Sequence, residues 1–379
     1  MSATTEQIIE ALRPVEDPEL YRSIVDLGMV RDVNVTANGV SLTVVLTVPG
    51  CPLRNEIQNR VTNAVAPLAP GGNVSIDFGV MTDAERQNVR VMLNGDPSAT
   101  AGSAQAHGHA EGRAIPFAAK DSKTKPLLIS SGKGGVGKSS VTTNLAVALA
   151  ARGHKVGIVD ADIYGFSIPR MLGADRDPVV IDNMLLPPEA HGVRCISIGY
   201  FVPDGEAVIW RGPMLHKALE QFLTDVFWDE PDYLLIDMPP GTGDIALSLS
   251  QYLPKAEVIV VTTPQPAAQK VARLSAAMAK KVNLPVRGVI ENMSWFTGDD
   301  GKRYELFGSG GGRELADELG VPLLAQIPLV TQLREGGDEG RPIAAVAPTS
   351  EAGAAFHALA EQVEGMRPKR IFSKGLKVL

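Results

Sequence analysis

The chain has 379 residues, 44% of them apolar and 21% charged, and a formal net charge of −7 at pH 7. The length predicts about two to three globular domains, and the acidic balance argues against a nucleic-acid partner. No apolar run reaches about 18 residues, and the first residues lack the basic and apolar pattern of a signal peptide, so a membrane partner is not expected. The two cysteines, Cys51 and Cys195, argue against a disulfide framework and favour a cytoplasmic protein.

Residues 1–94 predict a small α/β domain. Ile8, Ile9 and Leu12 would form the apolar face of a first helix. Asn38-Gly39 is a strong hairpin signal, because both residues tolerate the positive φ that tight turns need. The elements expected are strands at residues 30–35 and 40–46, a helix from Leu53 to about Val65, and a last strand at residues 74–78.

Cys51 lies where a predicted strand ends and a helix begins. The positive end of the helix dipole would lower the pKa of the thiol and favour the thiolate, which is the form that binds iron. A buried cysteine that only packs explains the position equally well. The surrounding segments, residues 17–19, 26–30 and 47–52, resemble a SufT-like domain of iron–sulfur assembly, whose cysteine matches Cys51, so the resemblance makes this residue a candidate Fe–S ligand.

Residues 95–125 predict a flexible linker, because they are small and polar and show no periodicity. His107 and His109 lie in it. Two histidines at this spacing are able to contribute to a metal site, but no cysteine or carboxylate is fixed beside them. A solvated linker is therefore the favoured interpretation.

From residue 126 to residue 379, apolar runs of strand length alternate with helical patterns. This alternation is typical of α/β proteins with a doubly wound, mostly parallel sheet. The strands expected lie at residues 126–130, 155–160, 193–198, 233–238, 258–262, 286–290 and 322–327, and two of the helices at residues 215–227 and 267–281.

A glycine-rich loop follows the first of these strands and fits the P-loop pattern G-x-x-x-x-G-K-S/T from Gly132 to Ser139. Its amides and the following helix N-terminus would bind phosphate oxygens, Lys138 would reach the β- and γ-phosphates, and Ser139 would ligate Mg²⁺. The expected fold is thus a P-loop NTPase. The residues expected to bind the nucleotide are Gly132, Lys133, Gly134, Gly135, Val136, Gly137, Lys138, Ser139 and Ser140.

Three aspartates end strands of the predicted sheet. Asp237 closes the apolar run at residues 234–236, as the Mg²⁺-binding aspartate of a Walker B strand does. Asp160 and Asp162 close another strand, where two carboxylates are able to hold a metal-bound water and orient an attacking one. The plainer alternative for Asp160 and Asp162 is that one of them is a helix N-cap and the other is solvated.

The order of these motifs resembles the Mrp/ApbC family of iron–sulfur cluster carrier proteins, within the MinD-like ATPases that have a deviant Walker A loop. The segments that carry the resemblance are residues 132–139, 160–165, 210–214, 237–244 and 291–294. It implies an ATP-hydrolysing homodimer that passes clusters to apo iron–sulfur proteins or works with assembly factors.

The resemblance also assigns roles to single residues. Lys133 would cross to the nucleotide of the partner subunit, Asp162 would position the attacking water, and Asp160 would lie near the Mg²⁺. Asn292 would contact the adenine of ATP, because an amide side chain pairs with its N6/N7 edge. The implied catalytic residues are Lys133, Lys138 and Asp162, the metal-site residues are Ser139, Asp160 and Asp237, and the cofactors are ATP and Mg²⁺, with a [4Fe-4S] cluster as a further candidate.

One departure from the family is clear. After residues 291–294 the family carries C-x-x-C, whereas this chain has no cysteine at residues 295–304. Asp299 and Asp300 are poor substitutes for thiolates and, with Gly301, predict a turn. Cys51 is then the better candidate for a cluster ligand, one from each subunit, whereas Cys195 lies in a predicted strand and is expected in the core.

Two other functions remain open from the sequence. An ATP-dependent regulator or scaffold that has lost cluster binding would explain the missing C-x-x-C. A MinD- or ParA-like ATPase that cycles on a surface would explain a basic tail at residues 367–379, although Gly375 and the shortness of the tail favour a docked or solvated segment.

Overall fold

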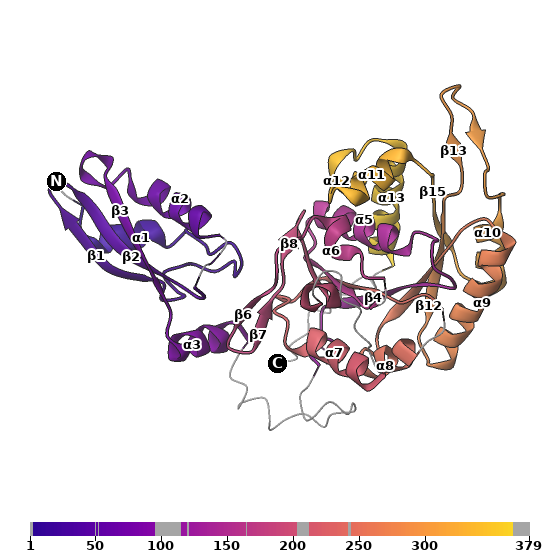
Figure 1. Cartoon of the computed structure of the whole chain (residues 1–379), viewed down its shortest axis with the longest axis horizontal. Coiled ribbons are helices and arrows are strands. Elements are labelled where there is room, and N and C mark those ends of the chain that lie inside the picture. Colours follow the sequence, from indigo (N-terminus) through magenta and orange to yellow (C-terminus); the bar gives the residue numbers. More distant parts are fainter. Residues whose placement is uncertain are drawn as a thin grey trace, which may run out of the picture. The chain divides into compact units, whose positions relative to one another are not determined.

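The chain folds as two units, shown in a computed structural model (Figure 1) that describes residues 3–49, 51, 53–94, 115–119, 121–163, 165–202, 212–241 and 244–366. Unit 1 comprises Met1–Gln105 together with Val179–Leu186, and unit 2 comprises Ala106–Pro178 and Pro187–Leu379. His107 and His109 of the predicted linker, and the basic tail at residues 367–379, lie outside the described residues.

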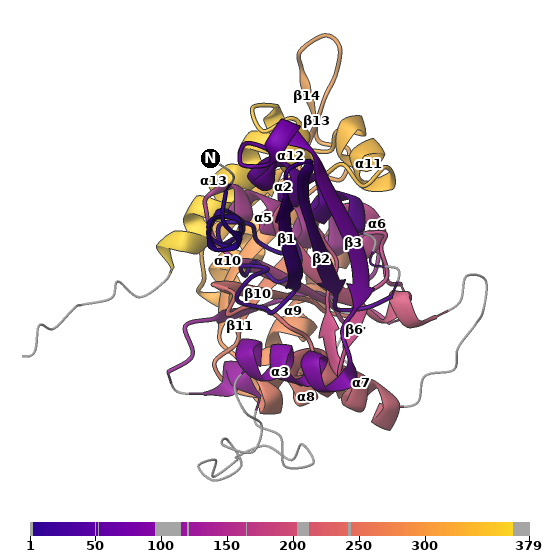
Figure 2. The ribbon, with the colours of Figure 1, turned by 90° about the vertical axis from the view of Figure 1, so that its left-hand side faces the viewer.

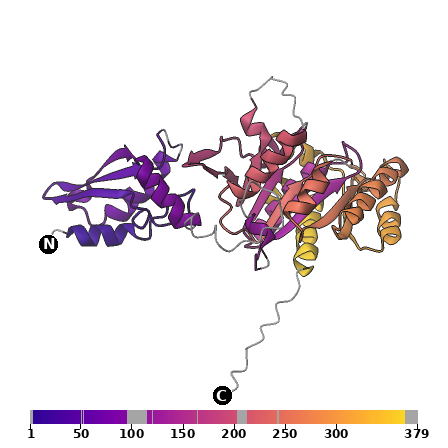
Figure 3. The same ribbon diagram turned by 90° about the horizontal axis from the view of Figure 1, so that it is seen from below.

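Unit 1 has the small α/β fold that the sequence predicts. Its sheet has the order β1-β2-β3, with β1 and β2 antiparallel and β2 and β3 parallel (Figure 2). Helices α1 and α2 contact each other and pack on this sheet (Figure 3), with Ile57, Val61 and Val65 buried at helical spacing. The bounds are α1 Thr5–Leu12, β1 Val30–Thr36, β2 Gly39–Leu46, α2 Arg54–Val65, η1 Pro70–Gly72 and β3 Val74–Val80.

Two further elements of unit 1 were not predicted. Helix α3 spans Asp83–Asn94, and Thr82 and Glu85 form the reciprocal hydrogen bonds of a capping box at its start. Strands β6 (Val179–Ile181) and β7 (Met184–Leu186) form a hairpin, in which Asp182 and Asn183 have positive φ values of 42° and 61°. Such a turn matches the twist of a hairpin. Arg90 of α3 pairs with Asp182 at 3.1 Å, so eight residues from later in the sequence complete unit 1.

Unit 2 is built on an eight-stranded sheet of order β15-β12-β11-β4-β10-β5-β9-β8. Strand β8 is antiparallel to β9 and the other neighbours are parallel, which confirms the doubly wound sheet. The chain begins the sheet at β4, continues on one side with β5, β8 and β9, and then places β10 between β4 and β5. Strands β11, β12 and β15 complete the other side. The bounds are β4 Lys125–Ser131, β5 Val156–Asp160, β8 Glu189–Ala190, β9 Val193–Ser197, β10 Tyr233–Asp237, β11 Glu257–Thr262, β12 Val286–Asn292 and β15 Leu323–Ile327.

Helix α5 (Lys138–Ala151) lies between this sheet and α13 (Glu351–Gly365), with α12 (Ile343–Val346) also against it (Figure 1). Every residue from Val141 to Leu149 is buried, as expected for a helix covered on all sides. The remaining segments are α6 Ile168–Leu172, η3 Ile198–Phe201, α7 Gly212–Thr224, α8 Asp244–Tyr252, α9 Pro266–Lys281, α10 Gly311–Leu319 and α11 Thr331–Asp338.

The end of the predicted linker is folded onto unit 2. Residues 116–118 form a short helix, η2, in which Phe117 is buried, and Thr124 donates a 2.7 Å hydrogen bond to the carbonyl of Pro231. The side chain of Lys255 binds the carbonyl of Ala119 at 2.7 Å. Residues 95–114 are outside the described part, so the proposed linker itself stays a prediction.

The segment at residues 295–304 forms a projecting hairpin made of β13 (Phe296–Thr297) and β14 (Arg303–Tyr304) (Figure 1). The predicted turn at Asp299–Gly301 is confirmed, with Gly301 at a φ of 74°. Glu351 at the start of α13 accepts hydrogen bonds from three side chains of this hairpin, those of Trp295, Thr297 and Arg303. A folded hairpin therefore occupies the place of the missing C-x-x-C.

Candidate functional site

The glycine loop connects β4, at the centre of the sheet, with the N-terminus of α5. Gly137 is the N-cap of α5 and has a φ of 78°, which disfavours any residue with a Cβ. At Gly132 a Cβ would lie 2.2 Å from the backbone of Val271 in α9. The loop is therefore packed at both ends, whereas Gly134 and Gly135 are exposed and free to approach a ligand.

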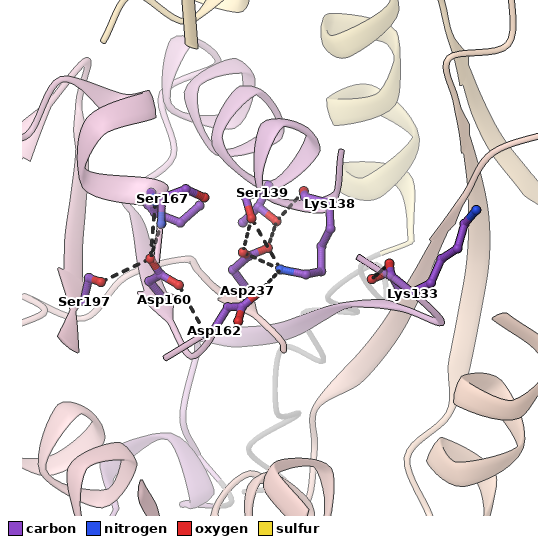
Figure 4. Close-up of polar contacts among 11 residues, drawn as sticks. Lys133, Lys138, Ser139, Asp160, Asp162, Ser167, Ser197 and Asp237 are labelled. Carbon is purple, nitrogen blue, oxygen red and sulfur yellow. Dashed lines mark hydrogen bonds and ion pairs between the residues drawn. The ribbon is translucent and has the colours of Figure 1, made fainter. Parts of the chain in front are cut away.

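Three predicted residues meet at the carboxyl ends of β4 and β10 (Figure 4). Lys138 Nζ donates to Asp237 Oδ2 at 2.6 Å, and Ser139 Oγ donates to the same oxygen at 2.6 Å. The Asp237 side chain is fully buried, so its charge depends on these partners. This is the point at which a sheet of this type binds its ligand.

Asp162 lies beside this cluster. Its Oδ2 atom is 3.7 Å from Lys138 Nζ, and its side chain is only partly exposed. Burial raises the pKa of Asp162, and the ammonium group of Lys138 opposes this rise. A carboxylate of raised pKa next to a lysine ammonium group is suited to hold and orient a water molecule.

Asp160, at the end of β5, is held by four hydrogen bonds. Its carboxylate accepts hydrogen bonds from the amides of Asp162, Ser167 and Ile168 and from Ser197 Oγ, at 3.1–3.3 Å (Figure 4). Burial, together with the charge of Asp237, raises the pKa of Asp160 to about 7. These contacts make Asp160 the anchor of the loop between β5 and α6, and its role toward Mg²⁺ stays a prediction.

Lys133 does not join the cluster. Figure 4 shows its side chain directed away from Lys138 and Asp237, and its Nζ lies 3.3 Å from Gln265 Oε1. Lys133 therefore lies apart from Lys138 and Asp237 of the same chain.

Asn292 ends β12 next to the loop. Its Nδ2 donates to the carbonyl of Val136 at 2.9 Å, whereas its buried Oδ1 has no hydrogen-bond partner among the described residues. A buried acceptor without a donor is unfavourable unless a ligand supplies one. Asn292 Oδ1 is therefore available to accept a hydrogen bond from a ligand beside the glycine loop.

The sequence of the chain matches the models of two known families. Residues 123–364 match the family described as NUBPL iron-transfer P-loop NTPase, and residues 5–78 match the family described as iron-sulfur cluster assembly protein. The chain belongs to the NUBPL iron-transfer P-loop NTPase family. The resemblance inferred from the sequence motifs is thereby confirmed for both parts of the chain.

Two relatives of this P-loop NTPase cover nearly its whole length. A protein of Mycobacterium leprae named iron-sulfur cluster carrier protein is 47% identical over 350 residues, which are 90% of this chain and 88% of that protein. A protein of the same name from Synechocystis sp. is 43% identical over 370 residues, covering 96% and 97% of the two chains. Both parts of the chain are therefore shared with these relatives.

A solved structure also resembles the chain. The nucleotide-binding protein of Archaeoglobus fulgidus in complex with ADP is 35% identical and has a TM-score of 0.52, covering 60% of this chain and 93% of its own. This match supports the P-loop NTPase fold. Within the part of the chain that the structure describes, none of the helices has the length and apolar character needed to cross a membrane.

The two cysteines of this P-loop NTPase differ in setting. Cys195 lies in β9 within the core of unit 2, where burial raises the pKa of its thiol to about 12, so it is not a ready thiolate. This confirms the expected core position. Cys51 belongs to unit 1, is mostly buried and precedes α2, while the described residues hold no group of three or more His, Cys, Asp or Glu side chains able to bind a metal ion.

Three polar side chains that organise the site were given no role from the sequence. Ser197 holds Asp160, Thr142 contacts Asp237, and Glu291 accepts hydrogen bonds from Ser294, Gln326 and the amide of Gly312. A lone serine or threonine in a strand or helix carries no pattern. Only the position of Glu291 next to Asn292, at the end of an apolar strand, offered a signal.

The contacts of Asp160 predict its contribution to stability. In Asp160→Asn the amide NH₂ would face N–H and O–H donors, so we expect the free energy of unfolding of the nucleotide-free protein to fall by about 2 kcal/mol. Urea unfolding followed by circular dichroism measures this. Asp177→Asn, at an exposed aspartate, is the control and should change little. Equal stability of wild type and Asp160→Asn would show that this carboxylate does not anchor the loop.

Proposed function

We propose that this protein binds and hydrolyses ATP with Mg²⁺ as a homodimer and carries iron–sulfur clusters to apoproteins in the cytoplasm. The observation that carries the nucleotide part is the convergence of Lys138, Ser139 and buried Asp237 within 2.6 Å contacts at the sheet edge. The relatives named iron-sulfur cluster carrier protein support the second part.

The cluster of Lys138, Ser139 and Asp237 fits both ATP and Mg²⁺. A triphosphate would attract Lys138 away from Asp237, leaving Asp237 Oδ2 and Ser139 Oγ as two oxygen ligands on one side of the site. Mg²⁺ prefers such ligands and keeps waters and phosphate oxygens for its other positions. When bound, it supplies neutralisation of charge on the β- and γ-phosphates.

In the proposed reaction, water attacks the γ-phosphorus in line with the leaving oxygen. Asp162 orients this water, and the loop amides with Lys138 stabilise charge on the phosphate oxygens. Lys133 of the partner subunit completes this charge stabilisation, a role supported by the direction of the side chain in Figure 4. Hydrolysis would therefore require two copies of the chain.

The contacts of Asn292 support a preference for ATP over GTP. With Nδ2 committed to the loop carbonyl, the remaining Oδ1 accepts a hydrogen bond, which adenine offers from its N6 amino group and guanine does not at O6. Base selectivity would then rest on one oriented amide oxygen.

Replacing Asn292 tests this selectivity. We expect Asn292→Ala to weaken binding of a fluorescent ATP analogue by about tenfold, through loss of one ligand hydrogen bond, and to weaken the GTP analogue less. Titrations followed by fluorescence give both affinities. Ser294→Ala, a buried neighbour that binds Glu291, is the control and should retain the preference. An unchanged ATP-to-GTP ratio in Asn292→Ala would contradict the assignment.

Replacing Lys133 tests the role across the dimer. In Lys133→Ala we expect ATP turnover to fall by about a hundredfold, because a charge at the γ-phosphate is lost, while ATP binding to the monomer persists. Sedimentation with and without ATP should show that the nucleotide-dependent dimer is lost. Lys270→Ala, at an exposed lysine of α9, is the matched control. A Lys133→Ala protein that dimerises normally with ATP would remove this role.

The iron–sulfur cluster is cargo in this proposal, and Cys51 is its proposed ligand. Residues 295–304 provide no thiolate, and Cys195 is sealed in the core. One chain therefore offers a single usable thiol, so a cluster would need Cys51 from each of two subunits or ligands from a partner protein.

Anaerobic reconstitution with iron and sulfide tests this ligand. We expect the wild type and Cys195→Ala to gain a visible charge-transfer band and bound iron, and Cys51→Ser to gain neither, because serine is a poor cluster ligand. Absorption spectra and iron analysis are the measurements. A cluster retained by Cys51→Ser would overturn the assignment to Cys51.

A second function is favoured by one observation. The hairpin at residues 295–304 has side chains that bind Glu351 and carries no thiol. If reconstitution leaves every variant without a cluster, the protein is better described as an ATP-dependent regulator or scaffold of cluster assembly.

A further inference from the structure

Asp237 has a third polar contact that the proposed mechanism does not use. The hydroxyl Oγ1 of Thr142 lies 2.6 Å from Asp237 Oδ1, the carboxylate oxygen that contacts neither Lys138 nor Ser139. Thr142 is fully buried on α5. Thr142 follows Lys138 by four residues and Ser139 by three, so its side chain lies next to both of theirs on the helix surface.

A threonine in a helix often bonds only the carbonyl four residues earlier, so this alternative has to be weighed. Thr142 Oγ1 is 3.0 Å from the carbonyl oxygen of Lys138 and 2.6 Å from Asp237 Oδ1. The hydroxyl has one proton, and both neighbours are acceptors. The shorter contact, with the charged oxygen, is the stronger one, so the Thr142 hydroxyl donates its hydrogen bond to the Asp237 carboxylate.

We propose that Thr142 is a positioning residue that fixes the Asp237 carboxylate for Mg²⁺. The proposal rests on the nucleotide and Mg²⁺ site described under the proposed function. When Lys138 leaves Asp237 for the phosphates, Thr142 still holds Oδ1, so the side chain keeps its orientation and Oδ2 stays directed toward Ser139. Without this hydroxyl, the buried carboxylate loses the partner that it has in both states.

The neighbouring residue provides a matched control. Thr143 is also buried on α5, and its hydroxyl has no hydrogen-bond partner among the described residues. Thr143→Val therefore removes the same group from the same helix without a contact to Asp237. Thr142→Ser keeps the hydroxyl and should behave as the wild type.

The test measures binding of a fluorescent ATP analogue at increasing MgCl₂ and, separately, in EDTA. We expect Thr142→Val to raise the half-saturating Mg²⁺ concentration by about tenfold, as loss of a hydrogen bond to a metal-binding carboxylate commonly does. The affinity of Thr142→Val for the ATP analogue in EDTA should stay within about twofold of the wild-type value, because the Thr142 hydroxyl acts on Asp237 and not on the nucleotide. Thr142→Ser and Thr143→Val should titrate as the wild type.

Two results would overturn the role of Thr142. One is an unchanged Mg²⁺ dependence in Thr142→Val, and the other is an equal loss in EDTA, which would indicate a general effect on the helix. If Thr142→Val does not fold, Thr142→Ala takes its place with the same expectations. A wild type that shows no Mg²⁺-dependent binding would instead contradict the proposed function, so the two failures are distinguishable.

Discussion

The fully buried carboxylate of Asp237 is the constraint on which the nucleotide site depends. A charge inside the sheet is unfavourable unless nearby groups compensate it. The three side chains that do so, those of Lys138, Ser139 and Thr142, all belong to the first turns of α5. The N-terminus of α5 must therefore lie at the end of β10, which in turn fixes the glycine loop between β4 and α5.

The same constraint explains how the site is able to change its ligands without losing stability. In the structure, Lys138 balances the charge of Asp237. In the proposed site, a bound Mg²⁺ would balance this charge when a triphosphate attracts Lys138 away from Asp237. Nucleotide and metal binding would then be coupled through this one carboxylate. Asp162, 3.7 Å from Lys138, lies beside the position that the lysine would leave.

The sequence predicts the parts of this site that depend on local pattern. Residues 132–139 have a fixed spacing, and Asp237 and Asn292 follow apolar strands whose ends align in a parallel sheet. The contacts of Thr142 with Asp237 and of Ser197 with Asp160 join residues distant in sequence, and nothing local marks them. The same holds for the fold, because the strands of the large sheet are apolar runs, whereas the pairing of Arg90 with Asp182, distant in sequence, has no local mark.

The connectivity of the chain links the nucleotide site to unit 1. Asp160 binds the first amides of α6 and the hydroxyl of Ser197 at the end of β9. Between α6 and β9 the chain runs through β6 and β7, which belong to unit 1. The chain therefore passes between the two units on either side of this hairpin as well as once before it. Because Asp160 and Ser197 lie before and after the excursion through β6 and β7, a single buried carboxylate joins the two segments of unit 2 that flank it.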